Sequence, residues 1–146
     1  MSEFIHYGNK KFNKNKFDEI KNLYFVKPLG GFWASRVNSE NGWKSWCEST
    51  NFNLDKYNKN NCFKFKLKEN ARVLTITKKE QLENLPKQNL PAEYKSLFVT
   101  LDFEKLAKQY DAMEVLISED SRLYWDLYGW DCDSLLVMNK NVIVEV

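Results

Sequence analysis

Apolar and basic side chains alternate without a break from Phe63 to Lys68. Three apolar residues point to one side of an extended chain and three lysines point to the other, because successive side chains in a strand face opposite ways. This period of two predicts a β-strand with one wet face. The buried face of such a strand has to pack on another layer of the same domain, so the chain needs a covered sheet.

The remaining patterns predict a mixture of strands and helices. Strands are expected at 3–7, 32–35, 62–76 with a turn at Glu69-Asn70, 112–118, 134–138 and 142–146. Helical segments are expected at 16–22, 42–50, 78–85, 102–110 and 121–129. The triplet Asn139-Lys140-Asn141 predicts a hairpin between the last two strands. This order is neither a regular βαβ series nor an all-β meander, and it indicates an α+β fold.

Length and composition indicate a single domain over residues 1–146. The net charge is +2, which gives no electrostatic case for a nucleic-acid binder. No run is long and apolar enough to span a membrane, and the N-terminus lacks a signal core, so no membrane partner is expected. Three isolated cysteines, Cys47, Cys62 and Cys132, predict buried free thiols in a cytoplasmic protein.

The single histidine, His6, lies near the end of the first expected strand. A lone histidine is commonly structural, and that interpretation stays open. Tyr7-Gly8 follows it, however, and a glycine at a strand end lets a ligand approach the backbone closely. His6, Tyr7 and Gly8 are therefore candidate binding residues.

A second candidate stretch follows the double glycine Gly30-Gly31. Trp33 either fills the core or forms a stacking wall for a flat or cationic ring, since aromatic faces bind both. Ser35 is a candidate hydroxyl partner in the same short strand.

Two carboxylates are candidates for chemistry. Glu114 stands in the centre of an expected strand, where an unpaired charge is costly and suggests a purpose. Asp133 directly precedes a late strand, and Asp131 stands two residues earlier. The alternative is that Asp131 caps a turn and Asp133 is solvated. A single histidine does not favour a histidine-based metal site, so no metal is expected. Neither G-x-S-x-G nor a phosphate loop occurs. A nucleophilic pair of His6 with a cysteine stays open.

Together, "FIHYG" and "GGFWASRVNSENGWKSWC" resemble the first two sequence blocks of the ADP-ribosyltransferase superfamily, in its poly(ADP-ribose) polymerase branch. His6 matches the family histidine, although Tyr7 separates it from Gly8. Trp33 stands where the family has tyrosine. Asp133 matches the position of the family's acid at the start of a late strand, where glutamate is usual, and Glu114 is the rival one strand earlier.

The resemblance implies a split sheet with inserted helices and NAD+ as the substrate. His6 and the backbone of Tyr7 or Gly8 would hold the adenosine ribose and the nicotinamide amide, and Trp33 would stack on the nicotinamide. The acid, Glu114 or Asp133, would bind the nicotinamide-ribose hydroxyl and stabilise the oxocarbenium-like transition state.

We therefore expect an enzyme that transfers ADP-ribose from NAD+ to an intracellular macromolecule, either a protein or a nucleic acid. A toxin, phage or defence effector with an antitoxin or inhibitor as partner fits this description. Two alternatives stay open: an RNA 2′-phosphotransferase of the same fold, and a non-catalytic domain of that fold that binds NAD+, another nucleotide or a protein.

Overall fold

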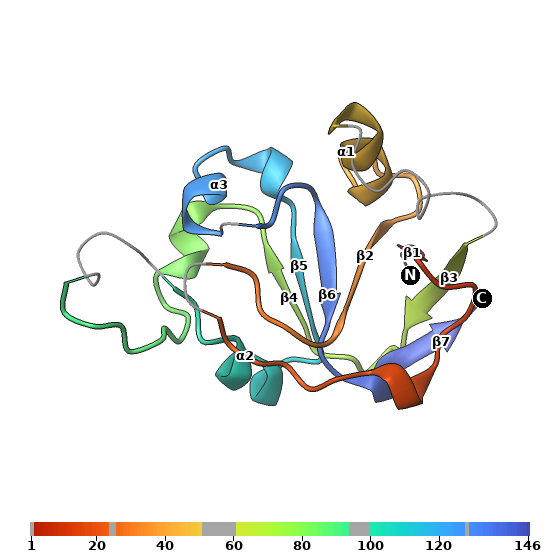
Figure 1. Ribbon diagram of the computed structural model, residues 1–146, viewed down its shortest axis with the longest axis horizontal. Helices are drawn as coiled ribbons and strands as arrows, with labels where there is room; N and C mark the ends of the chain where they lie inside the picture. The colour runs from red at the N-terminus through yellow and green to blue at the C-terminus, as the bar shows by residue number, and fades with distance from the viewer. Residues whose placement is uncertain (1, 24–25, 51–60, 94–99, 128) are drawn as a thin grey trace.

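Seven strands form one curled, mixed sheet, shown in the computed structural model of the protein (Figure 1). The structure describes residues 2–23, 26–50, 61–93, 100–127 and 129–146. The sheet has the strand order β4-β5-β6-β2-β1-β3-β7. The strands are β1 (Phe4–Tyr7), β2 (Phe32–Arg36), β3 (Cys62–Leu67), β4 (Val73–Ile76), β5 (Ala112–Val115), β6 (Ser134–Val137) and β7 (Ile143–Glu145). Only β4 and β5 are parallel; the other neighbours are antiparallel.

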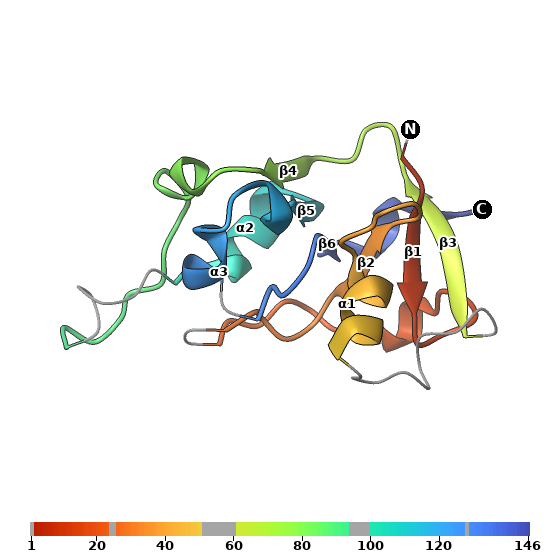
Figure 2. The same ribbon diagram turned by 90° about the horizontal axis from the view of Figure 1, so that it is seen from above.

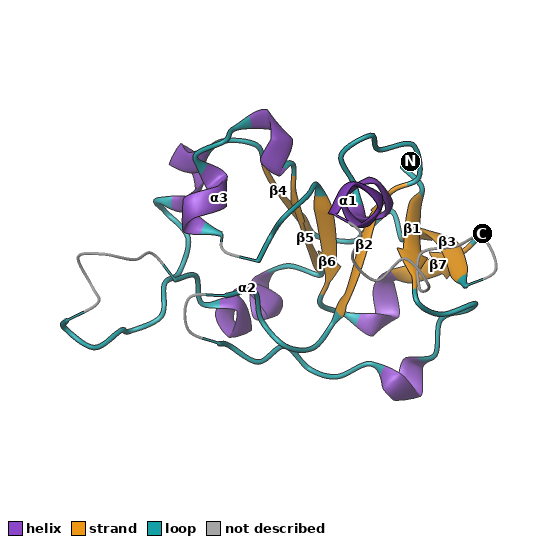
Figure 3. Cartoon of the chain, turned by 45° about the horizontal axis from the view of Figure 1, so that its top comes forward, coloured by secondary structure: helices purple, strands orange, loops and turns teal. Residues whose placement is uncertain are grey.

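In the described part of the chain, three α-helices lie around the sheet: α1 (Trp43–Thr50), α2 (Phe103–Gln109) and α3 (Leu123–Asp126). In Figure 3 α1 lies beside β2, and both ends of the chain lie on the side of β1, β3 and β7. The side chains of α2 and α3 that are buried, among them Leu106 and Leu123, pack with Met113 and Leu136 on one face of the sheet. The expected α+β class is confirmed.

The sheet consists of two halves that meet at a short seam (Figure 2). The β4-β5-β6-β2 half and the β1-β3-β7 half are joined where β1 pairs with β2, and that pairing covers Phe4↔Arg36 and Ile5↔Ser35. On its other side β1 pairs with β3 over all four of its residues. Beyond Ile5 the strands β1 and β2 therefore part, and this separation creates room at the ends of both strands.

The alternation at 62–68 is confirmed, because Phe65 and Leu67 are buried while Lys64 is exposed. The pairing expected at the C-terminus is wrong. Both edges of β6 are occupied, one by β5 and one by β2, and β7 pairs with β3 instead. A 3-10 turn at Lys140–Val142, capped by the side chain of Asn139, redirects the chain between them.

Other expected segments are shorter than predicted or lie elsewhere. The segment 62–76 forms two strands that do not pair, with β4 at one edge of the sheet and β3 near the other. The helix expected at 78–85 is a 3-10 turn at Lys79–Leu82, and the one expected at 121–129 is the single turn of α3. At 16–22 no helix forms; a 3-10 turn lies at Lys14–Lys16 instead.

Glycine is required at Gly30 and Gly31 because the chain there packs directly against other backbone segments. Both have positive φ, +85° and +61°, which glycine adopts without strain. A Cβ on Gly30 would collide with the carbonyl oxygen of Glu19, and one on Gly31 with that of Val137. The double glycine thus lets the chain enter β2 between β6 and the segment around Glu19.

Candidate functional site

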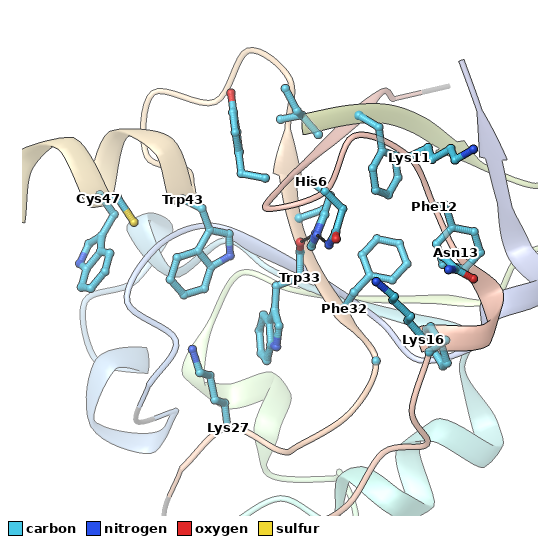
Figure 4. A pocket seen from close by; sticks show the side chains of 18 residues that line it. His6, Lys11, Phe12, Asn13, Lys16, Lys27, Phe32, Trp33, Trp43 and Cys47 are labelled. Carbon is cyan, nitrogen blue, oxygen red and sulfur yellow. Dashed lines mark hydrogen bonds between the residues drawn. The ribbon is translucent and has the colours of Figure 1, made fainter. Parts of the chain in front are cut away.

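A cavity of about 450 Å³ opens where β1 and β2 part (Figure 4). Its described lining is rich in aromatic rings and contains three lysines and no carboxylate. The lining residues are Ile5, His6, Tyr7, Asn9, Lys11, Phe12, Asn13, Lys16, Phe17, Lys27, Gly31, Phe32, Trp33, Ala34, Trp43, Trp46, Cys47 and Phe63. His6 and Trp33, two of the residues expected at the site, thus line a common space.

His6 lies at the point where the strands separate. Its Nδ1 donates a hydrogen bond of 2.6 Å to the carbonyl oxygen of Trp33, and its Nε2 accepts one of 3.2 Å from the side-chain amide of Asn9. These partners assign the proton to Nδ1, because a carbonyl can only accept. Phe32 and Phe63 flank the ring at 5.2 and 5.3 Å. Burial lowers the pKa of His6, although the hydrogen bond to Trp33 opposes this, so the ring is neutral at pH 7.

Acidification is therefore expected to destabilise the fold through His6. Below pH 6.5 the unfolded chain binds a proton that the folded chain does not, so the free energy of unfolding falls with falling pH. The slope from one such group is at most about 1.4 kcal/mol per pH unit. Thermal melting between pH 7.5 and 5.5 should show a smaller loss for His6→Gln than for the unaltered protein. Equal losses would show that His6 does not titrate in this way.

One half of the cavity is built from indoles. Trp33 comes from β2, while Trp43 and Trp46 come from α1. The rings of Trp33 and Trp43 meet edge to face at 6.1 Å, and Trp130 packs against Trp33 at 4.6 Å. Trp43 is buried, and its Nε1 has no hydrogen-bond partner in the described part of the chain. The side chain of Trp43 thus holds a buried donor without a partner in the described residues.

Ser35 positions this half of the cavity and does not line it. Its hydroxyl accepts a hydrogen bond of 2.9 Å from the backbone N–H of Trp43 and donates one of 3.0 Å to the carbonyl oxygen of Asp133. The first bond satisfies an orphan donor at the start of α1. In the structure the hydroxyl of Ser35, expected as a ligand partner, holds α1 against β2 and the start of β6.

Tyr7 and Gly8 lie at the end of β1. Tyr7 lines the cavity, and burial raises the pKa of its hydroxyl. Gly8 has a φ of +116° and its N–H donates to the carbonyl of Asn61 at 2.8 Å. That amide, a candidate ligand contact in the sequence, is bound within the protein.

The other half of the cavity was missed from the sequence. The segment after Gly8 contributes Phe12 and Phe17, whose rings pack against Phe32 of β2. It also contributes basic and amide groups to the lining. The backbone N–H of Phe12 donates to the carboxylate of Glu145 in β7, which ties this segment to the far edge of the sheet. The feature of the sequence that could have indicated this half is the pair of phenylalanines within the lysine- and asparagine-rich run 9–17. Its polar residues are Asn9, Lys11, Asn13 and Lys16.

The two candidate acids lie outside the lining of the cavity. Glu114 is 4% exposed, and its carboxylate accepts from Arg36 Nε and Nη2 at 2.8 and 2.9 Å. Asp133 accepts from the backbone N–H and the hydroxyl of Ser118 at 2.9 and 2.7 Å. The structure therefore brings His6 and Trp33 together at the cavity. The two acids lie outside its lining, where Glu114 binds Arg36 and Asp133 binds Ser118.

The cysteines differ in their surroundings. Cys47 lines the cavity from α1. Burial raises the pKa of Cys132 to about 12, and that thiol stays protonated at pH 7. This protonated state does not favour Cys132 as the nucleophile of a cysteine–histidine pair.

Within the described residues, no helix has the length and apolar character needed to cross a membrane. Comparison with known proteins adds no relative: the chain matches no protein-family profile, no curated protein and no solved structure.

Proposed function

We propose that the cavity binds a nucleotide through a flat ring, with NAD+ as the first candidate. The observation that carries this proposal is the composition of the described lining, eight aromatic residues with three lysines and no carboxylate. Aromatic faces stack on a nicotinamide or adenine ring, and lysine side chains attract phosphates. A volume of about 450 Å³ lies within the usual range for sites of small ligands.

ADP-ribosyl transfer from NAD+ is the activity we propose for this site. The parting of β1 and β2 at His6 and Trp33 favours it, because these are the residues at which the chain resembles the ADP-ribosyltransferases. The acceptor would be a macromolecule of the cell. The transfer also needs a carboxylate near the bound ribose, and Asp133 and Glu114 are the candidates.

Calorimetric titration with NAD+ tests the binding proposal. Trp33→Ala is expected to weaken NAD+ binding by about 1 to 3 kcal/mol, because stacking and apolar burial are lost together. Trp125→Ala is the matched control, since Trp125 is 87% exposed on α3 and outside the cavity lining. Thermal melting checks that both variants fold, and Trp33→Leu serves where alanine destabilises the packing on Trp130. Unchanged affinity in a folded Trp33 variant would remove Trp33 from the site.

A further inference from the structure

The ammonium group of Lys27 lies between two tryptophans of the cavity (Figure 4). Its Nζ is 4.9 Å from the ring centroid of Trp43 and 5.2 Å from that of Trp33. Both distances are within the range of about 6 Å over which a ring face attracts a cation. In the described part of the chain Lys27 forms no ion pair, and the cavity lining around it has no carboxylate. The indole faces are therefore its attractive partners.

The two rings are arranged as a corner. The planes of Trp33 and Trp43 are 79° apart, so a cation at the corner contacts both faces at once. Trp130 packs behind Trp33 and Trp46 packs beside Trp43, each nearly perpendicular to its neighbour. These contacts hold the corner in shape whether or not a cation occupies it.

We infer that Trp33 and Trp43 form an aromatic cage for a cationic group of a ligand, and that Lys27 fills this cage when no ligand is bound. The inference rests on the proposed function and deepens it, because the nicotinamide ring of NAD+ is a pyridinium cation. Ring faces attract such a cation as they attract an ammonium group. Entry of the pyridinium would displace Lys27, since two positive charges cannot share the corner.

A lysine in a nucleotide site has an obvious other role, which is to bind a phosphate. The two roles predict opposite effects of removing the charge. A phosphate-binding lysine strengthens NAD+ binding, so its loss weakens the complex. A lysine that competes for the cage weakens binding of the cationic ring, so its loss strengthens the complex.

Lys27→Met tests the cage, because methionine retains much of the stem that packs near Gly129 and removes the charge. Lys27→Arg is the control that keeps the charge. The probes for calorimetric titration are 1-methylnicotinamide, which is a cation, and nicotinamide, which is neutral and has the same ring. Lys27→Met is expected to bind 1-methylnicotinamide roughly tenfold more tightly than the unaltered protein does, on the scale of one cation–π contact. Nicotinamide should gain less than about threefold, and Lys27→Arg should behave as the unaltered protein.

The cage is overturned where a folded Lys27→Met variant binds 1-methylnicotinamide no more tightly than the unaltered protein. The same titrations with NAD+ separate this failure from failure of the proposed function. Tighter binding of 1-methylnicotinamide without NAD+ binding in any variant supports the cage and rejects the nucleotide site. Weaker NAD+ binding with unchanged binding of 1-methylnicotinamide assigns Lys27 to a phosphate, which rejects the cage and keeps the nucleotide site.

Discussion

Asp133→Asn is expected to lower the rate of nicotinamide release from NAD+ by about a hundredfold or more, while Glu114→Gln leaves it within about threefold. A fixed carboxylate stabilises positive charge that develops on the ribose, and loss of one such group has effects of this size. Asp133 is held at the start of β6 by Ser118, and its carbonyl shares Ser35 with the backbone of Trp43. The backbone carbonyl of Asp133 is thus linked through Ser35 to the cavity wall, while its carboxylate is bound to Ser118. Glu114, in contrast, is already neutralised by Arg36.

Chromatographic measurement of free nicotinamide at saturating NAD+ gives these rates. Both substitutions keep the size of the side chain, and melting temperatures show whether the variants fold. Ser118→Ala is a useful companion, because it removes the hydroxyl that orients Asp133 without changing any charge. Equal rates in all variants would mean that neither acid is catalytic and would leave the chain as a binding domain. A large loss in Glu114→Gln alone would transfer the role to Glu114.

Arg36→Leu is expected to lower the free energy of unfolding by about 2 to 3 kcal/mol. The substitution leaves the carboxylate of Glu114 buried in β5 without its bidentate partner, and breaking a buried ion pair on one side is strongly destabilising. The expected loss in the free energy of unfolding is smaller than for a fully buried pair because the side chain of Arg36 is 48% exposed. Urea denaturation at pH 7 measures it.

Two further variants control this measurement. Replacing Arg36 and Glu114 together by leucine should recover most of the loss, because no charge is then left unpaired. Lys44→Leu removes one partner of an exposed pair, Lys44–Glu48 at 3.8 Å, and should change stability by less than about 1 kcal/mol. A loss in Arg36→Leu no larger than in Lys44→Leu would show that Glu114 is adequately solvated without Arg36.

Local elements were predictable from the sequence where neighbouring residues decide the structure. The alternation of Phe63, Lys64 and Phe65 predicts β3, since side chains in a strand alternate between its faces whatever the strand pairs with. The helix expected at 42–50 forms as α1, Trp43–Thr50, after a segment whose polar residues are typical of helix starts. The candidates His6 and Trp33 were also found in this way, from glycines beside aromatic residues, and they do line one cavity.

Pairing and charge partners were decided by the tertiary structure. β6 and β7 are near neighbours in the chain, yet β7 pairs with β3 because β5 and β2 occupy both edges of β6. The sequence of a strand does not show which strands of the sheet will have an unpaired edge. Likewise, a carboxylate in the centre of a strand suggested chemistry, but the partner of Glu114 is Arg36, 78 residues away.

The cavity shows the same division. The sequence by itself determined which residues are aromatic, basic or free to turn, because these properties belong to single residues and their neighbours. The tertiary structure decided that the run 9–17, the strand after Gly31, the start of α1 and Lys27 surround one space. That space exists because β1 pairs with β2 only through Phe4 and Ile5, so the next residues are left apart and their side chains face a common opening.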